Sequence, residues 1–100
     1  MPTKSVEYRL APKATEDMEA VWLYSLHEWG AEQADHYIDD LTAAFGFLAE
    51  SPKSGVACEA IRAGYRKYPV IRHVAYYRET SYGIEIIRVL HDRMLASRHL

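Results

Sequence analysis

The sequence predicts an α+β fold in which a small, twisted, mainly antiparallel sheet carries a helical hairpin on one face, in the order β-α-α-β-β-β. Three observations predict it. Apolar residues alternate at period two near the start, recur at helical spacing through residues 12–50, and return to strand-like runs after residue 64. Strands clustered after helices are typical of α+β proteins. With 100 residues, 49% of them hydrophobic, the chain is expected to form a single domain over residues 1–100.

Four strands are expected, one near the start of the chain and three after residue 64. In SVEYRLA, Val6, Tyr8 and Leu10 share one face, as in a half-buried strand. The later strands are expected in YRKYP, VIRHVAYYRE and GIEIIRVLH, and TSYG between the last two is a turn that makes a hairpin. The first strand must insert into or flank the sheet, because alone it could not bury its apolar face.

Residues 12–50 are expected to form two helices. Pro12 suits the first turn of a helix, with Thr15 as a competing N-cap, and Gly30 ends this helix. The second helix should end near Glu50, because the residue before a proline disfavours helix. A connection this short makes the pair an antiparallel hairpin. The two apolar stripes are Met18, Val21, Trp22, Leu26 and Trp29, and then Ala34, Tyr37, Ile38, Leu41, Phe45 and Leu48.

Composition and charge bear on location and partners. The start of the chain lacks the apolar run of a signal peptide, and no segment is apolar for long enough to cross a bilayer, so we expect a soluble, cytoplasmic protein. Cys58 is the only cysteine and is interpreted as a packed or bystander thiol. Residues 1–60 carry four basic and eleven acidic groups, whereas residues 61–100 carry eight basic and three acidic ones. Either the halves neutralise each other in one fold, or the second half has an acidic partner.

The order and spacing of several stretches resemble the ParE branch of the RelE/ParE superfamily of toxins from bacterial toxin–antitoxin pairs. These stretches are WGAEQADHYIDDL, IRAGYRKYPVIRHVAYYRE, and IEIIRVLHDRM with the final RHL. The resemblance extends from the first strand to the last residue. It implies a β-α-α-β-β-β toxin of a type II pair, of the kind associated with plasmid stabilisation. It also implies a hetero-oligomer with a ParD-like antitoxin, whose tail wraps the toxin and whose N-terminal domain binds DNA.

The resemblance leaves the target open. ParE-like toxins are associated with poisoning of DNA gyrase, which would bring this chain to DNA only through gyrase or the antitoxin. RelE-like relatives cut mRNA on the ribosome. Because the fold is shared, three functions are weighed: a gyrase-binding toxin without catalysis, a ribosome-dependent endoribonuclease, and a non-toxic remnant that only binds its antitoxin.

A ribonuclease can be sketched from the later strands. Cutting RNA at the 2′-hydroxyl needs a general base, a proton donor and cations on the phosphate. His91 has the right titration range. The cations would be Arg66, Arg72 and Arg88, with His73 and Tyr65 as further candidates. Against this, the lysine run and the late tyrosine that RelE-like nucleases tend to carry are not evident.

The strand pattern also bears on the polar end of IEIIRVLHDRM. In a regular strand Arg88 would face with Ile84, Ile86 and Leu90, and His91 with Ile87 and Val89, unless a bulge intervenes. Arg88 could instead pair with Glu79 or Glu85 at the edge of the core, and His91 could cap the strand end. We interpret this end as a target-binding surface without confident catalytic residues; Leu95 stands where the family commonly has an acidic residue. The target-binding candidates are Arg88, His91, Arg93, Met94 and Leu95.

The remaining motifs favour structural roles. Glu32, His36 and Asp40 recur every four residues, but a solvated helix face explains them and no fourth metal ligand is nearby. The chain has no GxxxxGK phosphate loop and no nucleophile elbow. We therefore expect no metal and no cofactor. The larger aromatic residues could stack on bases, but most occupy core-type positions, and packing is the expected role of Trp22, Trp29, Tyr37, Tyr65, Tyr76 and Tyr77.

Overall fold

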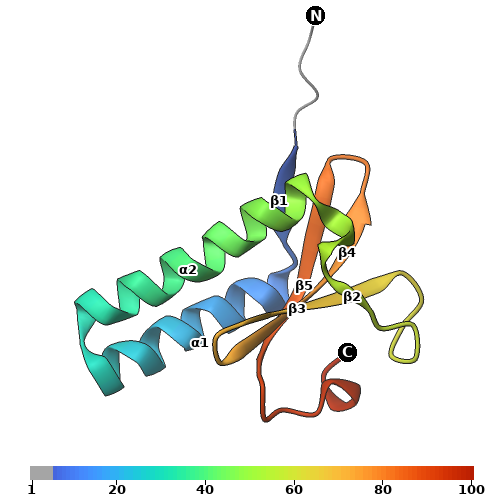
Figure 1. The fold of residues 1–100 in the computed structure, drawn as a ribbon. Helices are drawn as coiled ribbons and strands as arrows, with labels where there is room; N and C mark the ends of the chain where they lie inside the picture. Colours follow the sequence, from blue (N-terminus) through green and yellow to red (C-terminus); the bar gives the residue numbers. More distant parts are fainter. Residues whose placement is uncertain (1–5) are drawn as a thin grey trace, which may run out of the picture.

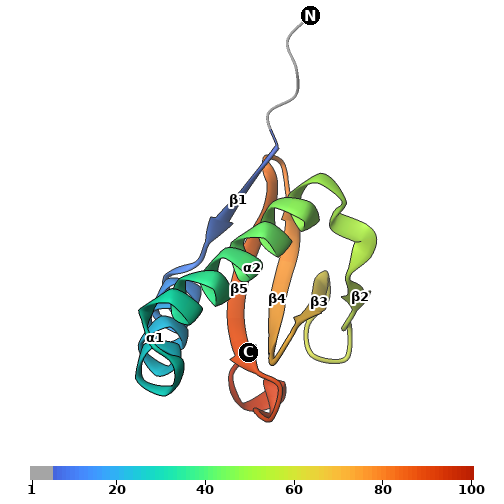
Figure 2. The ribbon, with the colours of Figure 1, turned by 60° about the vertical axis from the view of Figure 1, so that its left-hand side comes forward.

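A helical hairpin packs on one face of a five-stranded sheet in the computed structural model, which describes residues 6–100 (Figure 1). The predicted class and order are confirmed, with one short strand added after the helices. Figure 2 shows the sheet behind the hairpin, so the layers are those of an α+β protein. The elements are β1 (Glu7–Leu10), α1 (Pro12–Trp29), α2 (Ala31–Glu50), η1 (Pro52–Ser54), β2 (Val56–Ala57), β3 (Tyr65–Val70), β4 (His73–Thr80), β5 (Gly83–His91) and η2 (Ala96–Arg98).

The sheet places the first strand of the chain beside the last. The strand order is β1-β5-β4-β3-β2, with β1 parallel to β5 and the other pairs antiparallel. β1 therefore flanks the sheet, as one of the two expected solutions, and runs only from the pair Glu7–Gly83 to the pair Leu10–Ile86. The rest of β5 extends past the end of β1. The candidate site lies at this stretch of β5, which pairs with β4 on one side and extends past β1 on the other.

The helices begin and end close to the predicted positions. Pro12 is the first residue of α1, and Ala11 occupies the cap position without a side-chain bond. Thr15 lies inside the helix and donates its N–H to the Ala11 oxygen, so it is not the N-cap. Gly30, with φ of 91°, separates the helices in a conformation that glycine adopts freely, and α2 ends at Glu50 as predicted.

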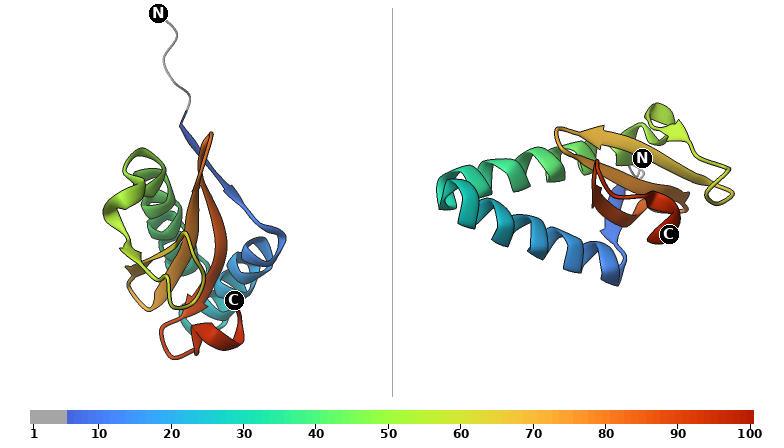
Figure 3. Two further views of the ribbon diagram at one scale, coloured as in Figure 1. Left: turned by 90° about the vertical axis from the view of Figure 1, so that its right-hand side faces the viewer. Right: turned by 90° about the horizontal axis from the view of Figure 1, so that it is seen from below.

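The hairpin buries the predicted stripe of α2 more fully than that of α1. Five of the six predicted α2 residues are buried, and Ile38 packs partly against the core. In α1 the buried residues are Ala14, Val21 and Ser25. Trp29 was expected in the core and is 51% exposed. The reason is that the turn of the hairpin extends beyond the sheet, as the right-hand view of Figure 3 shows from below, so no strand covers this end.

A bulge in β5 changes which residues share a face. Tyr76 pairs with Arg88 and Tyr77 pairs with Ile86, so Ile87 is the extra residue. Before the bulge, Ile84 and Ile86 face the helical hairpin; after it, Val89 does. The strand therefore has the bulge that the sequence left open and not the regular alternation: Leu90 does not share the face of Ile84.

The opposite face of the sheet has a second, smaller core. Tyr76, Leu90 and the free thiol of Cys58 are buried there. Burial raises the pKa of Cys58, which keeps the thiol protonated and inert. Partly buried residues from the loop after β2, from β3 and β4, and from the C-terminal segment complete the cluster, namely Ile61, Tyr65, Val74, Ala96 and Leu100. The chain after β5 thus folds back onto the sheet instead of leaving it.

Candidate functional site

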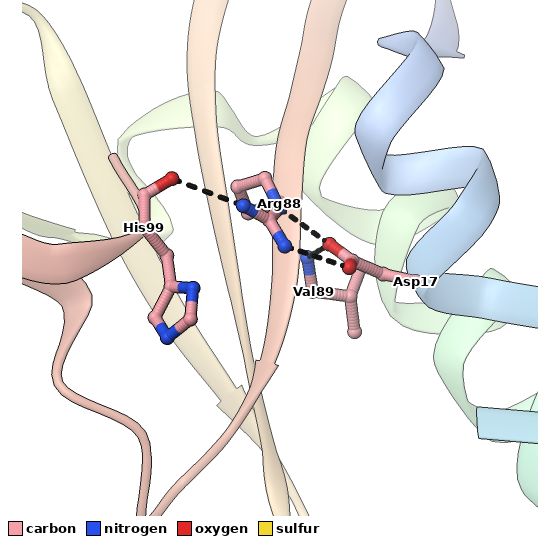
Figure 4. Close-up of polar contacts among 4 residues, drawn as sticks. All are labelled: Asp17, Arg88, Val89 and His99. Atoms are coloured by element: carbon pink, nitrogen blue, oxygen red, sulfur yellow. Dashed lines mark hydrogen bonds and ion pairs between the residues drawn. The ribbon is translucent and has the colours of Figure 1, made fainter. Parts of the chain in front are cut away.

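Arg88 and Asp17 form a two-pronged ion pair between β5 and α1 (Figure 4). Arg88 donates from Nε to Asp17 Oδ2 at 2.8 Å and from Nη2 to Asp17 Oδ1 at 2.9 Å, and both side chains are 15% exposed. These bonds raise the pKa of Arg88. The alternative in which Arg88 pairs with Glu79 or Glu85 is wrong, because Arg88 pairs with Asp17 and Glu85 accepts from Arg78.

The geometry of the sheet explains why Asp17 is there. The last backbone contact from the β1 side is the Ala11 N–H bonded to the Ile86 oxygen. Beyond that point the edge of β5 needs another acceptor, and Asp17 Oδ2 accepts the Val89 N–H at 2.9 Å. One carboxylate thus satisfies a strand edge and a guanidinium together. The pair connects residues 71 positions apart, which no local pattern could indicate.

His91, at the end of β5, has two competing partners for one ring nitrogen. Its Nδ1 lies 3.1 Å from the Arg93 amide nitrogen and 3.0 Å from Asp92 Oδ1. The amide N–H can donate only to an unprotonated Nδ1, whereas Asp92 attracts a protonated one. With an unprotonated Nδ1, His91 accepts the Arg93 N–H and caps the strand end; with a protonated Nδ1, it pairs with Asp92. The first arrangement is the strand-end cap expected from the sequence.

His73 lies beside His91 and is more enclosed. The two rings meet edge to face with centroids 5.3 Å apart, and Tyr37 Oη lies 2.5 Å from His73 Nδ1. Burial lowers the pKa of His73, and the neighbouring His91 lowers it further. Burial also raises the pKa of Tyr37. Tyr37 is therefore the proton donor in this hydrogen bond, and a neutral His73 accepts it.

The two histidines line a mainly apolar hollow of about 350 Å³ between α1 and the end of β5. Tyr24 of α1 belongs to this hollow and is 59% exposed, although the sequence pattern did not single it out. The signal available in the sequence was that Tyr24 lies outside the buried stripe of α1 although its neighbours are largely apolar. The lining residues are Asp17, Ala20, Val21, Tyr24, His73, Val89, His91 and Met94.

The three arginines proposed for phosphate binding lie in three different places. Arg88 is bonded to Asp17. Arg66 donates from Nη1 to the Gly55 oxygen at 2.8 Å, at the β2 side of the sheet. Arg72 lines a separate hollow of about 470 Å³ with Tyr37. None of the three arginines lines the hollow of the two histidines, so the described residues do not assemble the cations that the nuclease sketch requires.

The residues that follow β5 face outward. The Met94 N–H donates to the His91 oxygen and turns the chain away from the strand. Met94 is 49% and Leu95 is 60% exposed, and Arg93 is exposed as well. We call Arg93, Met94 and Leu95 the outward turn. It presents one cation and two apolar side chains, which suits a contact with another macromolecule.

Residues 6–100 hold neither a cluster of metal-binding side chains nor a helix able to cross a membrane. In this range no group of three or more His, Cys, Asp or Glu side chains could hold a metal ion, so Glu32, His36 and Asp40 do not gather into a site. No helix of the described chain combines the length and apolarity that crossing a membrane requires.

Comparisons with known proteins agree with the fold and with the family. The profile described as the ParE toxin of type II toxin–antitoxin systems, parDE, matches residues 8–96. A protein named Toxin ParE1 from Caulobacter vibrioides is 44% identical over 93 residues, covering 93% of this chain and 96% of the relative. Toxin ParE1 from Mycobacterium tuberculosis is 40% identical over 97 residues, covering 96% and 99%.

A solved structure shares the fold at lower identity. It is described as a chromosomal ParDE TA system from P. aeruginosa, with a TM-score of 0.75 and 19% identity over 89% of this chain and 98% of the other. The profile match and the two curated relatives extend over nearly the whole chain. This chain therefore belongs to the ParE toxin family of type II toxin–antitoxin systems.

Proposed function

We propose that this ParE-family toxin inhibits or poisons DNA gyrase in the cytoplasm by protein–protein binding, without cutting a nucleic acid itself. The observation that carries the proposal is the dispersal of the arginines: Arg66, Arg72 and Arg88 lie in three places, and none of them lines the hollow of His91. Binding through a docking surface does not require these arginines to gather around one phosphate. The outward turn, with the adjacent His91, offers exposed apolar and basic contacts for it.

We further propose that a ParD-like antitoxin neutralises this chain in a hetero-oligomer. The relatives are named as ParE toxins, and the similar structure is described as a ParDE system. Exposed apolar residues on the hairpin, including Leu23 and Trp29, provide surface that a wrapping peptide would bury. DNA would be reached only through the antitoxin or gyrase.

A supercoiling assay tests the gyrase proposal. Purified gyrase should lose supercoiling activity or accumulate cleaved DNA when the toxin is in excess. Leu95→Asp places a charge on the outward turn and should weaken this effect at unchanged folding. The matched control is Arg78→Met, which removes an exposed cation elsewhere on the sheet and should act like wild type. Full gyrase activity and no cleaved DNA with excess wild-type toxin would refute the target.

The second candidate is a ribosome-dependent endoribonuclease. The observation in its favour is the contact of His91 with His73 in one hollow, since a pair of imidazoles could exchange a proton with substrate. Translating ribosomes with added toxin should then yield mRNA cut within codons, and His91→Ala should abolish the cuts. Intact mRNA in this assay rules the nuclease out. A chain that leaves growth unharmed when expressed alone would instead be an antitoxin-binding remnant.

A further inference from the structure

We propose that Asp17 and Arg88 are positioning residues that hold the segment from Asp92 to Leu100 in place, and that Arg88 does not itself contact the target. This inference rests on the proposed function, because the segment includes the outward turn. Arg88 was a target-binding candidate by sequence. Its side chain is mostly covered: two of its guanidinium bonds go to Asp17 of α1 in a partly buried position, and the third goes to the exposed backbone oxygen of His99 (Figure 4).

The contacts form a continuous chain from α1 to the C-terminal segment. Asp17 accepts two hydrogen bonds from Arg88, and Arg88 donates its third, from Nη1, to the His99 carbonyl oxygen at 3.0 Å. The His99 N–H in turn bonds to the Ala96 oxygen within η2. The acceptor on His99 is backbone, so the bond depends on where this segment runs and not on which side chain stands there.

Two further attachments hold the same segment. The Asp92 N–H donates to the Arg72 oxygen at 2.9 Å, which fixes the segment where it leaves β5. At the other end, Ala96 and Leu100 pack against the small core around Leu90. The outward turn lies between these two points of attachment. If the attachment at the Ala96–Leu100 end loosens, the outward turn is no longer held in a fixed orientation relative to α1.

The chain offers a matched control for the pair. Arg78 also donates from Nε to a carboxylate at 2.8 Å, that of Glu85, but the two side chains are 47% and 26% exposed. Water screens and replaces such an exposed contact. The Asp17–Arg88 pair is less accessible and also bonds two backbone groups, so the same Arg→Met substitution should have very different local effects at the two positions.

Hydrogen exchange and growth arrest together test the proposal. Arg88→Met keeps the aliphatic stem and removes the guanidinium; the amides of Arg98, His99 and Leu100 should then exchange at least about tenfold faster. Growth arrest on expression should be lost at a temperature where circular dichroism shows the variant folded. Arg88→Lys retains the charge and should restore part of both readouts. Arg78→Met should match wild type in both.

If Arg88→Met does not fold, a second variant tests the same proposal. Asp17→Asn retains an oxygen that can accept the Val89 N–H but removes the charge that holds Arg88, and it should loosen the same amides. His99→Ala leaves the carbonyl acceptor in place and should leave those amides protected.

The outcomes separate this inference from the gyrase proposal. Unchanged exchange in folded Arg88→Met would show that the pair does not fasten the segment. Faster exchange with full growth arrest would show that the fastening has no bearing on activity. Lost arrest with unchanged exchange would make Arg88 a contact residue. If wild type arrests growth without affecting gyrase, the target is wrong, and the comparison of variants by growth arrest still decides the inference.

Discussion

Removing one hydroxyl, by Tyr77→Phe, should destabilise the protein far more than its size suggests. Tyr77 is fully buried, and its hydroxyl donates to the Pro52 oxygen at 2.6 Å and accepts the Gly55 N–H at 2.9 Å. The phenylalanine ring fills the same space but leaves a backbone donor and acceptor without partners. A buried group left unpaired costs about 1–3 kcal/mol, and the Pro52 side is partly accessible to water, so the loss should be about 2–4 kcal/mol.

Urea unfolding followed by circular dichroism measures this loss. For a chain of this size, about 3 kcal/mol corresponds to a fall in Tm of roughly 10–25 °C. Tyr68→Phe is the matched control: Tyr68 is partly buried on β3, and among the described residues its hydroxyl has no hydrogen-bond partner. The control should change stability by less than about 0.5 kcal/mol. A Tyr77→Phe protein as stable as the control would refute the reasoning, because the hydroxyl would then not tether the segment before β2.

Three further outcomes are expected. Burial lowers the pKa of His73 below 6.5, so the stability due to its neutral form is complete above pH 6.5 and is lost as the pH falls below it. His73→Asn should therefore reduce the dependence of the urea midpoint on pH between pH 7.5 and 5. Gly83→Ala should cost at least about 2 kcal/mol, seen in the same unfolding assay, because φ is 142° and a Cβ would clash with the backbone oxygen of Glu7. Leu95→Asp should leave the free energy of unfolding within about 0.5 kcal/mol, while expression of this variant arrests growth less than wild type. A urea midpoint of His73→Asn that depends on pH as strongly as that of wild type would contradict the role of His73. An unchanged midpoint of Gly83→Ala would contradict the close approach to Glu7. Full growth arrest by Leu95→Asp would contradict the role of the outward turn.

The regular elements were predictable because their signals are local. Apolar spacing, Gly30 and the Ser51–Pro52 pair sufficed to place both helices and the end of α2. Two features of the fold could not be predicted from the sequence. β2 is two residues long in a loop-like stretch, too short for any period to register. The exposure of Trp29 depends on how far the hairpin extends past the sheet, which is a tertiary property.

The candidate site was less predictable because its contacts are long-range. The bulge at Ile87 exchanges the faces of the residues after it, and no residue type in IEIIRVLH marks it. The partner of Arg88 is Asp17, whose sequence position suggested only an acidic residue near the start of a helix. The outward turn was easier to foresee, since residues that leave a strand are generally exposed.

The strand order has a consequence for synthesis. β5 lies between β1 and β4, so the first strand of the sheet has no hydrogen-bonded neighbour until residues 83–91 have been made. Contacts between such distant parts of a chain form late, because a long loop must close first. While it emerges from the ribosome, the polypeptide would hold a helical hairpin over an unfinished sheet. The surface proposed to bind the target would form only after β5 and the outward turn have been translated.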